Sequence, residues 1–222
     1  MPRPRTSVSQ EDYLKAIWEI VQEEQVPISA RLAEDLGVTP PAVTAALKRM
    51  TRHGYLRVVR GGRIVLTPKG RNVAEHLVLR HRLAEKLLTE VIGLEWTRAH
   101  EEAERMEHAI SPEVEKLLLK RFGSNGSCPH GVPLFGGPAR LRKKTGAVPL
   151  SAIEPGESVE ILRVYEKDAK FLEFVAAMGL RPGARVHVLR REYDETMTLG
   201  LGQKKIHLGK PATSRMWVRR SS

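Results

Sequence analysis

The residue pattern changes once along this chain of 222 residues, and the change limits what the chain can fold into. Up to residue 122 the apolar residues recur at the three- and four-residue spacing of helices. Residues 123–138, GSNGSCPHGVPLFGGP, are rich in Gly, Pro and Ser and indicate a linker or an ordered loop. Short alternating runs separated by turn residues follow. We therefore predict a mainly α protein with a β C-terminal domain.

The N-terminal part has the pattern of a helix-turn-helix. Residues 8–25 predict a first helix, with Ser9 in the N-cap position of a capping box. Residues 27–38 predict a second helix that Ser29 opens and Gly37 closes, and residues 39–54 predict a third that Thr39 caps. Two short helices joined by a tight turn with glycine are typical of DNA-binding proteins.

A hairpin and a basic surface follow this motif. The run YLRVVRGGRIVLT alternates apolar and basic residues around Gly61-Gly62, which predicts a hairpin with a two-residue turn and hence a winged helix-turn-helix. Between Leu36 and Ala74 there is no Asp or Glu, and eight cations fall inside this window: Lys48, Arg49, Arg52, Arg57, Arg60, Arg63, Lys69 and Arg71. This distribution indicates a nucleic-acid partner.

The expected DNA contacts divide into two kinds. Residues 39–50 would form the recognition helix in the major groove, where four residues near its N-terminus meet base edges: Thr39, Pro41, Ala42 and Thr44. Five cations would hold phosphates: Lys48, Arg49, Arg52, Arg60 and Arg63. The alternative for each cation is solvated surface, and we expect about half of them to contact DNA.

Three domains are predicted along the chain: a winged helix-turn-helix domain (1–72), a helical metal-binding and dimerisation domain with the linker (73–140), and a small β-barrel of SH3 type (141–222). One helix, KFLEFVAAMGL, interrupts the strands of the last domain. Apolar residues between 87 and 119 would form a dimer interface, although core packing explains most of them equally well.

The segment HEEAERMEHAI points to a metal site. On an α-helix His100, Glu104, Glu107 and His108 would lie along one face, and two imidazoles with two carboxylates suit a divalent transition ion. A second helical pair, His81 and Glu85 at i and i+4, could add ligands. The alternative is a solvated charged face, which we favour for Glu101, Glu102 and Arg105.

Composition excludes several other classes. The net charge of +11 fits a polyanionic partner, and the single cysteine excludes an internal disulfide, so a cytoplasmic protein is expected. The basic start MPRPRTS does not continue into an apolar run, and no stretch has the length of a membrane span. A metallohydrolase is the rival from another class, but there is no HExxH and no activated-nucleophile pattern, so no enzyme is predicted. A peptide-binding adaptor would want an aromatic-lined groove.

These motifs together resemble one family over nearly the whole chain. EDYLKAIWEI is similar to the first helix of the diphtheria toxin repressor/manganese transport regulator family, HRLAEKLL to its HRLxExxL signature, and HEEAERMEHAISPEVEKLL to its ligand segment. FVAAMGLRPGARVHV resembles the SH3-like domain of the long members. The resemblance implies a metal-dependent transcriptional repressor that binds a palindromic double-stranded DNA operator as a homodimer, without a small-molecule substrate.

The resemblance also implies a primary metal site formed by Asp12, Glu104, Glu107 and His108. The positions of Asp12 and Glu104 look like methionine and cysteine in iron-responsive members and like carboxylates in manganese-responsive ones, so Mn²⁺ is expected, with Fe²⁺ as the alternative. Other divalent transition metals would bind in vitro. Lys15 stands where manganese regulators have a further carboxylate, which disagrees with their coupled two-metal cluster.

Two sets of ligands remain open for a second site. Longer manganese-responsive members resemble this chain in pairing a C-x-H segment, here Cys128 and His130, with the equivalent of Glu85 and a carboxylate of the SH3-like domain. Asp168 is the predicted carboxylate and Glu166 the second choice. Alternatively, as in iron-responsive relatives, the ligands would be His81, Glu85 and His100.

Overall fold

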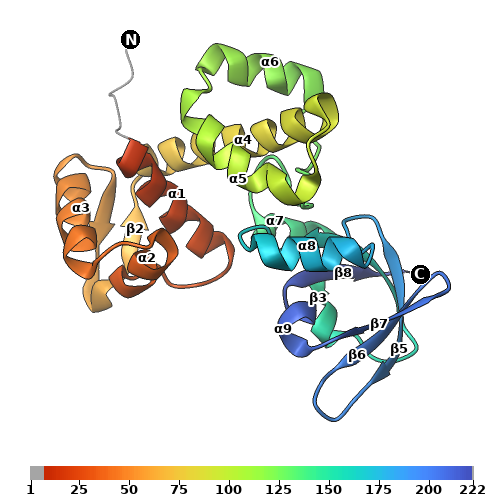
Figure 1. Cartoon of the computed structure of the whole chain (residues 1–222). Helices are drawn as coiled ribbons and strands as arrows, with labels where there is room; N and C mark the ends of the chain where they lie inside the picture. Colours follow the sequence, from red (N-terminus) through yellow and green to blue (C-terminus); the bar gives the residue numbers. More distant parts are fainter. Residues whose placement is uncertain (1–7, 222) are drawn as a thin grey trace.

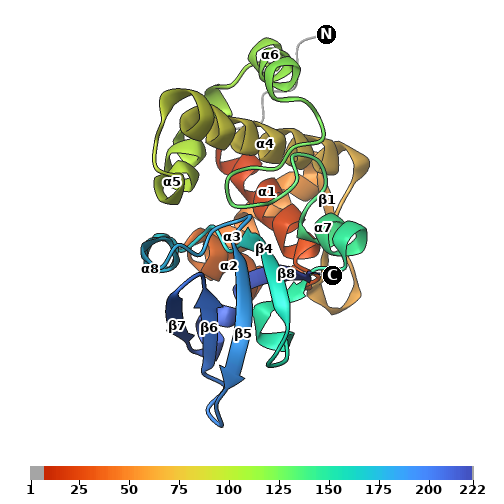
Figure 2. The same cartoon turned by 90° about the vertical axis from the view of Figure 1, so that its right-hand side faces the viewer.

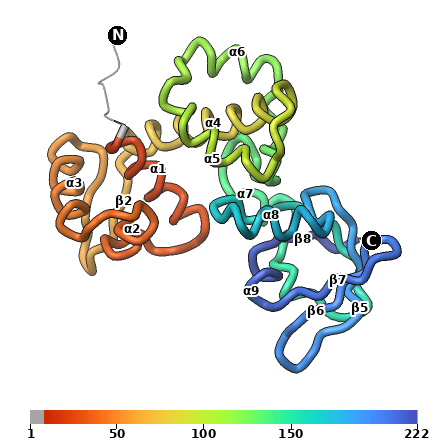
Figure 3. The backbone as a smooth tube through the Cα atoms, in the orientation of Figure 1, coloured from red at the N-terminus to blue at the C-terminus, as the bar shows by residue number. Residues whose placement is uncertain are grey.

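The computed structural model describes residues 8–221, so the basic start of the chain lies outside the described residues. Three units follow one another along the chain, each with its own apolar core (Figures 1 and 3). The predicted class, mainly helical with a C-terminal domain rich in strands, is confirmed. Within residues 8–221, no helix has both the length and the apolar character that crossing a membrane requires.

The first unit is a winged helix-turn-helix. Its elements are α1 (Val8–Gln22), α2 (Ser29–Leu36), α3 (Pro40–Arg52), β1 (Leu56–Val58), the 3₁₀ turn η1 (Arg60–Gly62) and β2 (Ile64–Leu66). Gly37 ends α2 with a left-handed φ of 61°, which glycine adopts without strain. Strands β1 and β2 pair antiparallel as the predicted wing, but the turn is longer than predicted. The Val59 N–H donates to Arg63 C=O at 2.9 Å and closes a turn of three residues, Arg60–Gly62, instead of two.

The predicted caps of this unit differ in detail. Ser29 is the first residue of α2 instead of its cap, and Thr39 precedes α3 without a side-chain hydrogen bond to it. Ser9 lies inside α1. Pro40 and Pro41 at the start of α3 have no N–H, so they leave fewer backbone donors for Thr39 to cap.

The second unit is helical. It consists of α4 (Pro68–Leu87), the π turn η2 (Leu88–Ile92), α5 (Trp96–Met106), the 3₁₀ turn η3 (Glu107–Ala109) and α6 (Pro112–Phe122). The long helix α4 joins two units, because Ala74 and Val78 belong to the core of the first and Leu79 to Leu88 contribute to the core of the second. Helix α1 packs across α4, so the N-terminal end of α1 lies near the helical unit (Figure 1).

The segment 123–138 is an ordered loop. The Val164 N–H of the third unit donates to His130 C=O at 3.0 Å, and the Arg82 guanidinium of α4 donates to Pro133 C=O at 2.8 Å. Gly131 has a φ of +89°, and a Cβ atom there would lie 1.8 Å from Leu162 C=O, so only glycine allows this close approach. A helix that the sequence did not predict, α7 (Pro138–Thr145), follows the loop.

The third unit is a six-stranded antiparallel sheet in the order β3-β8-β4-β5-β6-β7. Its strands are β3 (Val148–Pro149), β4 (Ser158–Val164), β5 (Arg185–Arg191), β6 (Met197–Leu201), β7 (Lys204–Leu208) and β8 (Met216–Arg220). The 3₁₀ turn η4 (Leu150–Ala152), helix α8 (Ala169–Ala177) and the short α9 (Lys210–Thr213) connect them. In the part of the chain described, no hydrogen-bonded ladder joins β7 to β3, so the predicted barrel is an open sheet at this seam.

The third unit docks on the other two. Helix α8 packs against α5, and Figure 2 shows it at one end of the strands, facing the helices. Four ion pairs join the third unit and α7 to the end of α1 and the turn after it: Lys167 with Glu19 at 2.6 Å, Arg163 with Glu23 at 2.7 Å, and Arg142 with Glu24 at 3.1 Å and with Glu23 at 3.9 Å. The third unit is therefore placed against the DNA-binding unit as well as the helical one.

Candidate metal centre and DNA-binding surface

Imidazole and carboxylate side chains gather where α1, α4, α5, η3 and the ordered loop meet. They form three groups whose ligand atoms lie within 4.8 Å of one another. We name them by position: the α1 group (Asp12, Glu107, His108), the α5 group (His81, His100, Glu104) and the loop group (Glu85, Cys128, His130). All nine residues were predicted metal ligands, so the structure brings together every predicted ligand except Asp168.

The α1 group joins two units of the protein. Asp12 lies in the first turns of α1, whereas Glu107 and His108 lie in η3. His108 Nε2 is 3.0 Å from Asp12 Oδ1 and 3.7 Å from Glu107 Oε1. The predicted helix does not run regularly through residue 108, because the backbone tightens into a 3₁₀ turn after Met106. Glu104 and Glu107 nevertheless face the same imidazole, since His81 Nδ1 is 3.8 Å from Glu104 Oε1 and 2.6 Å from Glu107 Oε2.

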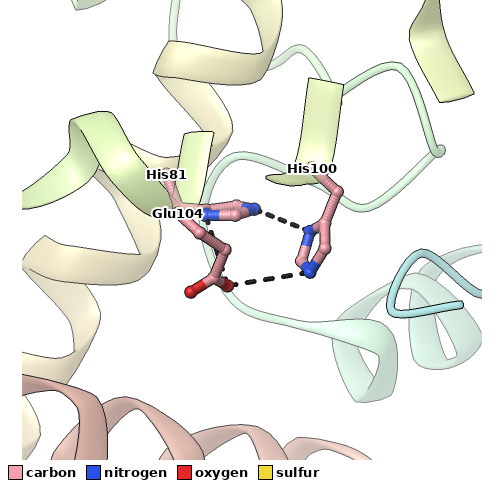
Figure 4. A group of neighbouring side chains, drawn as sticks. All are labelled: His81, His100 and Glu104. Atoms are coloured by element: carbon pink, nitrogen blue, oxygen red, sulfur yellow. Dashed lines mark hydrogen bonds and ion pairs between the residues drawn. The ribbon is translucent and has the colours of Figure 1, made fainter. Parts of the chain in front are cut away.

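The α5 group, drawn in Figure 4, lies beside the α1 group, since His81 Nδ1 is 2.6 Å from Glu107 Oε2. His81 comes from α4, and His100 and Glu104 come from successive turns of α5. His81 Nε2 is 2.9 Å from His100 Nδ1, and His100 Nε2 is 3.6 Å from Glu104 Oε1. Glu104, predicted as a ligand with Asp12, thus belongs by distance to the histidines of this group.

The loop group is the most deeply buried of the three. Glu85, Cys128 and His130 expose 1%, 5% and 0% of their surface. His130 Nδ1 is 3.0 Å from Glu85 Oε1 and 4.0 Å from Cys128 Sγ, and its Nε2 is 3.0 Å from Trp96 C=O. The second imidazole nitrogen is thus held by a backbone carbonyl, as is common for metal-bound histidines.

The structure does not bring Asp168 into the loop group. Its carboxylate caps α8 by accepting from Phe171 N–H at 3.0 Å, and it pairs with Arg215 at 2.7 Å. The second choice, Glu166, pairs with Arg163 at 3.2 Å and is not part of the loop group either. Burial raises the pKa of the Glu166 carboxyl, but Arg163, His130 and His100 outweigh burial and lower the pKa overall. The sequence pattern here was too irregular to show that Asp168, two residues after Glu166, is the N-cap of α8.

Lys15 is a side chain whose contacts the sequence did not predict. Its ammonium group is 2.7 Å from Glu104 Oε1, 2.7 Å from Glu107 Oε2 and 3.2 Å from His81 Nδ1, with only 5% of the residue exposed. Burial lowers the pKa of Lys15, but Glu19, Glu107 and Glu104 outweigh it and raise the pKa. Lys15 therefore stands as a cation between the α1 and α5 groups.

Proton positions in the three groups follow from the same charges. Hydrogen bonds to Asp12 and Glu11 raise the pKa of His108 to about 10, and Glu11, which the sequence did not single out, holds His108 Nδ1 at 2.7 Å. Burial and Lys15 lower the pKa of His81, yet Glu85 and Glu107 raise it to about 9 overall. Protons therefore occupy these imidazoles at neutral pH, and a metal ion would displace them.

The donor set fits a divalent transition ion. Glu107 and Glu85 are buried carboxylates, and buried carboxylates require neutralisation by neighbouring positive charge. Imidazole nitrogens and carboxylate oxygens are ligands for manganese, iron and zinc alike, while Cys128 adds a softer donor to the loop group. A cavity of about 770 Å³ between α1 and α5 borders Asp12, His100, Glu104 and His108, so solvent reaches the first two groups.

The predicted DNA contacts lie on one exposed surface of the first unit. All nine side chains are exposed on α3, on its approach and at the tip of the wing: Thr39, Pro41, Ala42, Thr44, Lys48, Arg49, Arg52, Arg60 and Arg63. Within residues 8–221, none of the five cations forms an ion pair with a carboxylate, in contrast to the paired cations of the third unit such as Arg219 and Arg220. Their charge is available to a polyanion.

Comparisons with known proteins agree with this geometry. Residues 5–62 match the model of the iron-dependent repressor N-terminal DNA-binding domain, residues 67–136 that of its metal-binding and dimerisation domain, and residues 148–220 the FeoA domain. The iron-dependent repressor IdeR of Mycobacterium leprae is 35% identical over 189 residues, which are 80% of this chain and 82% of IdeR. The chain belongs to the iron-dependent repressor family. Members of this family are DNA-binding transcriptional repressors, which confirms the prediction that the chain is not an enzyme.

Other members of the iron-dependent repressor family extend the comparison. The diphtheria toxin repressor of Corynebacterium diphtheriae is 32% identical over 207 residues, 89% of this chain and 91% of that protein. A manganese-dependent transcriptional repressor solved with manganese superposes with a TM-score of 0.81 at 29% identity and covers 96% of this chain and 100% of its own. IdeR of T. acidophilum has a TM-score of 0.75 at 27% identity and covers 98% and 100%. The predicted resemblance and the winged-helix fold are thereby confirmed.

Proposed function

We propose that this protein is a Mn²⁺-dependent transcriptional repressor that binds a palindromic DNA operator as a metal-activated homodimer and controls genes of metal homeostasis. The observation that supports this most directly is the composition of the α1 group. Asp12 belongs to the first helix of the DNA-binding unit, and Glu107 and His108 belong to the helical unit. An ion held by these three residues would tie the two units together.

Coupling of metal to DNA binding follows from this tie. Without the ion, protonated His108 holds the α1 carboxylates by ion pairs, at 2.7 Å to Glu11 and 3.0 Å to Asp12. The ion supplies charge that neutralises Asp12 and Glu107 together, which fixes the start of α1. Since α1 and α3 share one apolar core, fixing α1 fixes the recognition helix.

The proposed dimer rests on exposed apolar side chains of the helical unit. Val91 and Ile92 of η2 expose 46% and 68% of their surface, and Val114 and Leu117 of α6 expose 43% and 59%. Two copies related by a twofold axis would present two recognition helices, which fits an inverted repeat in the DNA. Such a repressor works in the cytoplasm of the cell.

The proposed metal is Mn²⁺ because the α1 group offers only oxygen and nitrogen donors. Fe²⁺ is the second candidate, favoured by the 32–35% identity to relatives named as iron-dependent or diphtheria toxin repressors. Anisotropy titrations with each metal under anaerobic conditions distinguish the two. If Fe²⁺ activates DNA binding at a lower free concentration than Mn²⁺ does, Fe²⁺ replaces Mn²⁺ as the proposed metal.

The central test is DNA binding with and without metal. A labelled duplex selected from a random pool is titrated with the full chain in Mn²⁺ and in EDTA, and binding is expected only in Mn²⁺. Glu107→Ala and His108→Ala should remove the response to Mn²⁺ while the fold stays intact by circular dichroism. Glu101→Ala, at an exposed position of the preceding helix α5, is the matched control. Equal affinity in Mn²⁺ and EDTA contradicts the proposal.

A further inference from the structure

Strand β7 is an open edge of the sheet in the third unit. Among the described residues it pairs with β6 alone, and Figure 2 shows it at the outer side of the sheet. Counted from the two-residue turn at 202–203, hydrogen-bonded pairs alternate with non-bonded pairs along β6 and β7, and Lys205 and His207 fall in the non-bonded pairs. Their N–H and C=O groups therefore point away from β6, and no backbone hydrogen bond from elsewhere in residues 8–221 reaches them.

The outer face of the sheet is hollowed next to this edge. The strand register places Ser158, His187, Gly200 and Lys205 in one row across β4, β5, β6 and β7. Gly200 has no side chain, and a hollow of about 610 Å³ opens over this row. Ser158 Oγ lies 3.0 Å from His187 Nδ1, so the second nitrogen of this imidazole is left for a ligand.

Cations without partners border the hollow. Arg185, Lys204 and Lys205 line it with exposed side chains, and none of them forms an ion pair with a carboxylate in the part of the chain described. Glu160, which lies opposite Arg185 in the register, pairs with Arg219 at 2.9 Å instead. Three positive charges around one hollow repel one another, and a bound anionic group would relieve this repulsion.

The edge and the hollow together select the chemistry of a ligand. A free strand edge offers N–H donors and C=O acceptors at the spacing of a second strand, which an extended polypeptide matches. Alternate side chains of an added strand would lie beside Lys205 and His207 on the outer face, where the cations favour carboxylates. A second copy of β7 fits poorly, because pairing would set lysines against lysines.

We propose that β7 and the hollow beside it form a docking site for an acidic, extended segment of a partner protein, which adds to the sheet as a further strand. Figure 1 shows this sheet and α3 at opposite ends of the molecule, so the site is separate from the predicted DNA contacts. It also uses none of the predicted metal ligands. The inference thus goes beyond the proposed function and is testable in EDTA, whether or not the metal controls DNA binding.

The first experiment titrates the full-length wild type with labelled short peptides in EDTA and follows fluorescence anisotropy. The probes are a peptide of alternating glutamate and valine, its lysine and valine counterpart, and the glutamate peptide with all backbone nitrogens methylated. Only the first should bind, because the second has the wrong charge and the third keeps its charge but has no N–H donors. Absence of binding by the first peptide overturns the docking site, and equal binding by the methylated peptide overturns strand addition.

The second experiment changes the protein. Lys204→Gln/Lys205→Gln should weaken binding of the glutamate peptide by about tenfold. The matched control is Lys143→Gln/Lys144→Gln, which removes two charges from adjacent exposed positions of α7 and should bind as wild type does. Equal affinities of the two double variants overturn the proposal.

Two further outcomes would name another role for this edge. Displacement of the peptide from wild type by a scrambled DNA duplex would make a nucleic acid the occupant, which overturns the proposal. Lysines that only guard the edge would appear as self-association of Lys204→Gln/Lys205→Gln in analytical ultracentrifugation, with no peptide binding to wild type, and this result overturns it as well.

Discussion

Arg60 at the tip of the wing offers a quantitative test of the DNA-binding surface. It lies in η1, between Val59 and the two glycines with positive φ, and it is exposed without an ion-pair partner among residues 8–221. Gly61 and Gly62 carry no side chain that would keep a phosphate away. We expect Arg60 to hold one phosphate per protomer, hence two per dimer.

The size of the effect follows from counterion release. Each neutralised phosphate contributes about 0.9 to the slope of log affinity against log salt. If all five exposed cations of both protomers contact phosphates, the slope is about −9, and if half of them do, about −4.5. Arg60→Gln removes two contacts per dimer and should make the slope shallower by about 1.8 in either case. The affinity loss should be similar for a selected duplex and a scrambled one, because phosphates carry no sequence.

The assay is fluorescence anisotropy in saturating Mn²⁺ over a salt range of about 50 to 200 mM. The control is Arg185→Gln, which removes the same charge from an exposed position on β5 of the third unit that has no ion pair with the described residues. This variant should keep the wild-type slope. Equal slopes for Arg60→Gln and wild type would show that the wing does not contact the backbone, and equal changes in both variants would show that only net charge matters.

Three further perturbations test other parts of the molecule. Leu117→Asp on α6 should shift the protein from dimer to monomer in analytical ultracentrifugation, since it places a charge in the exposed apolar surface, whereas Lys120→Asp should leave the dimer intact. Gly131→Ala should destabilise the protein by roughly 2–4 kcal/mol in denaturant unfolding, because it adds left-handed strain and a clash with Leu162 C=O; Gly156→Ala, with a similar φ but open space, should cost only about 1 kcal/mol. Mn²⁺ should slow protease cleavage between Gly123 and Gly137 in wild type and much less in Cys128→Ala/His130→Ala, and equal protection would remove these two residues from the metal ligands.

Local signals in the sequence predicted most of the fold. The glycines at positions 37 and 54 and the Ser111-Pro112 pair mark helix ends that the structure contains, and Ser111 Oγ accepts from Val114 N–H as a cap should. Helix α7 was not predicted because PARLRKKT has almost no apolar periodicity. Its position is set by tertiary contacts, such as those of Arg142 with Gln22 C=O at the end of α1 and with Glu24. The wing was predicted with a turn one residue too short, since adjacent glycines fit both turn lengths.

The metal ligands were predictable as residue types and only partly as groups. Helical spacing places His100 and Glu104 together, but the 3₁₀ turn that carries Glu107 and His108 has no sequence signature. By distance Glu104 groups with the histidines and not with Asp12. Lys15 and Glu11 contact residues that lie 66 to 97 positions further along the chain. Such contacts depend on how α1 crosses α4 and meets η3, which no local pattern encodes.

Glu85 explains why the sequence left two second sites open. Its Oε1 atom lies 3.2 Å from His81 Nε2, 3.4 Å from His100 Nδ1 and 3.0 Å from His130 Nδ1. One buried oxygen thus touches both alternative ligand sets, and its pKa is held well below the usual value because His130 and His81 outweigh burial. An ion bound by Cys128 and His130 through this oxygen would withdraw it from His81 and His100. Lys15 Nζ already contacts Glu104 Oε1, the carboxylate oxygen nearest those two histidines, at 2.7 Å, and His130 is the imidazole nearest Glu85 Oε1, so the distances favour the loop group as the partner of Glu85.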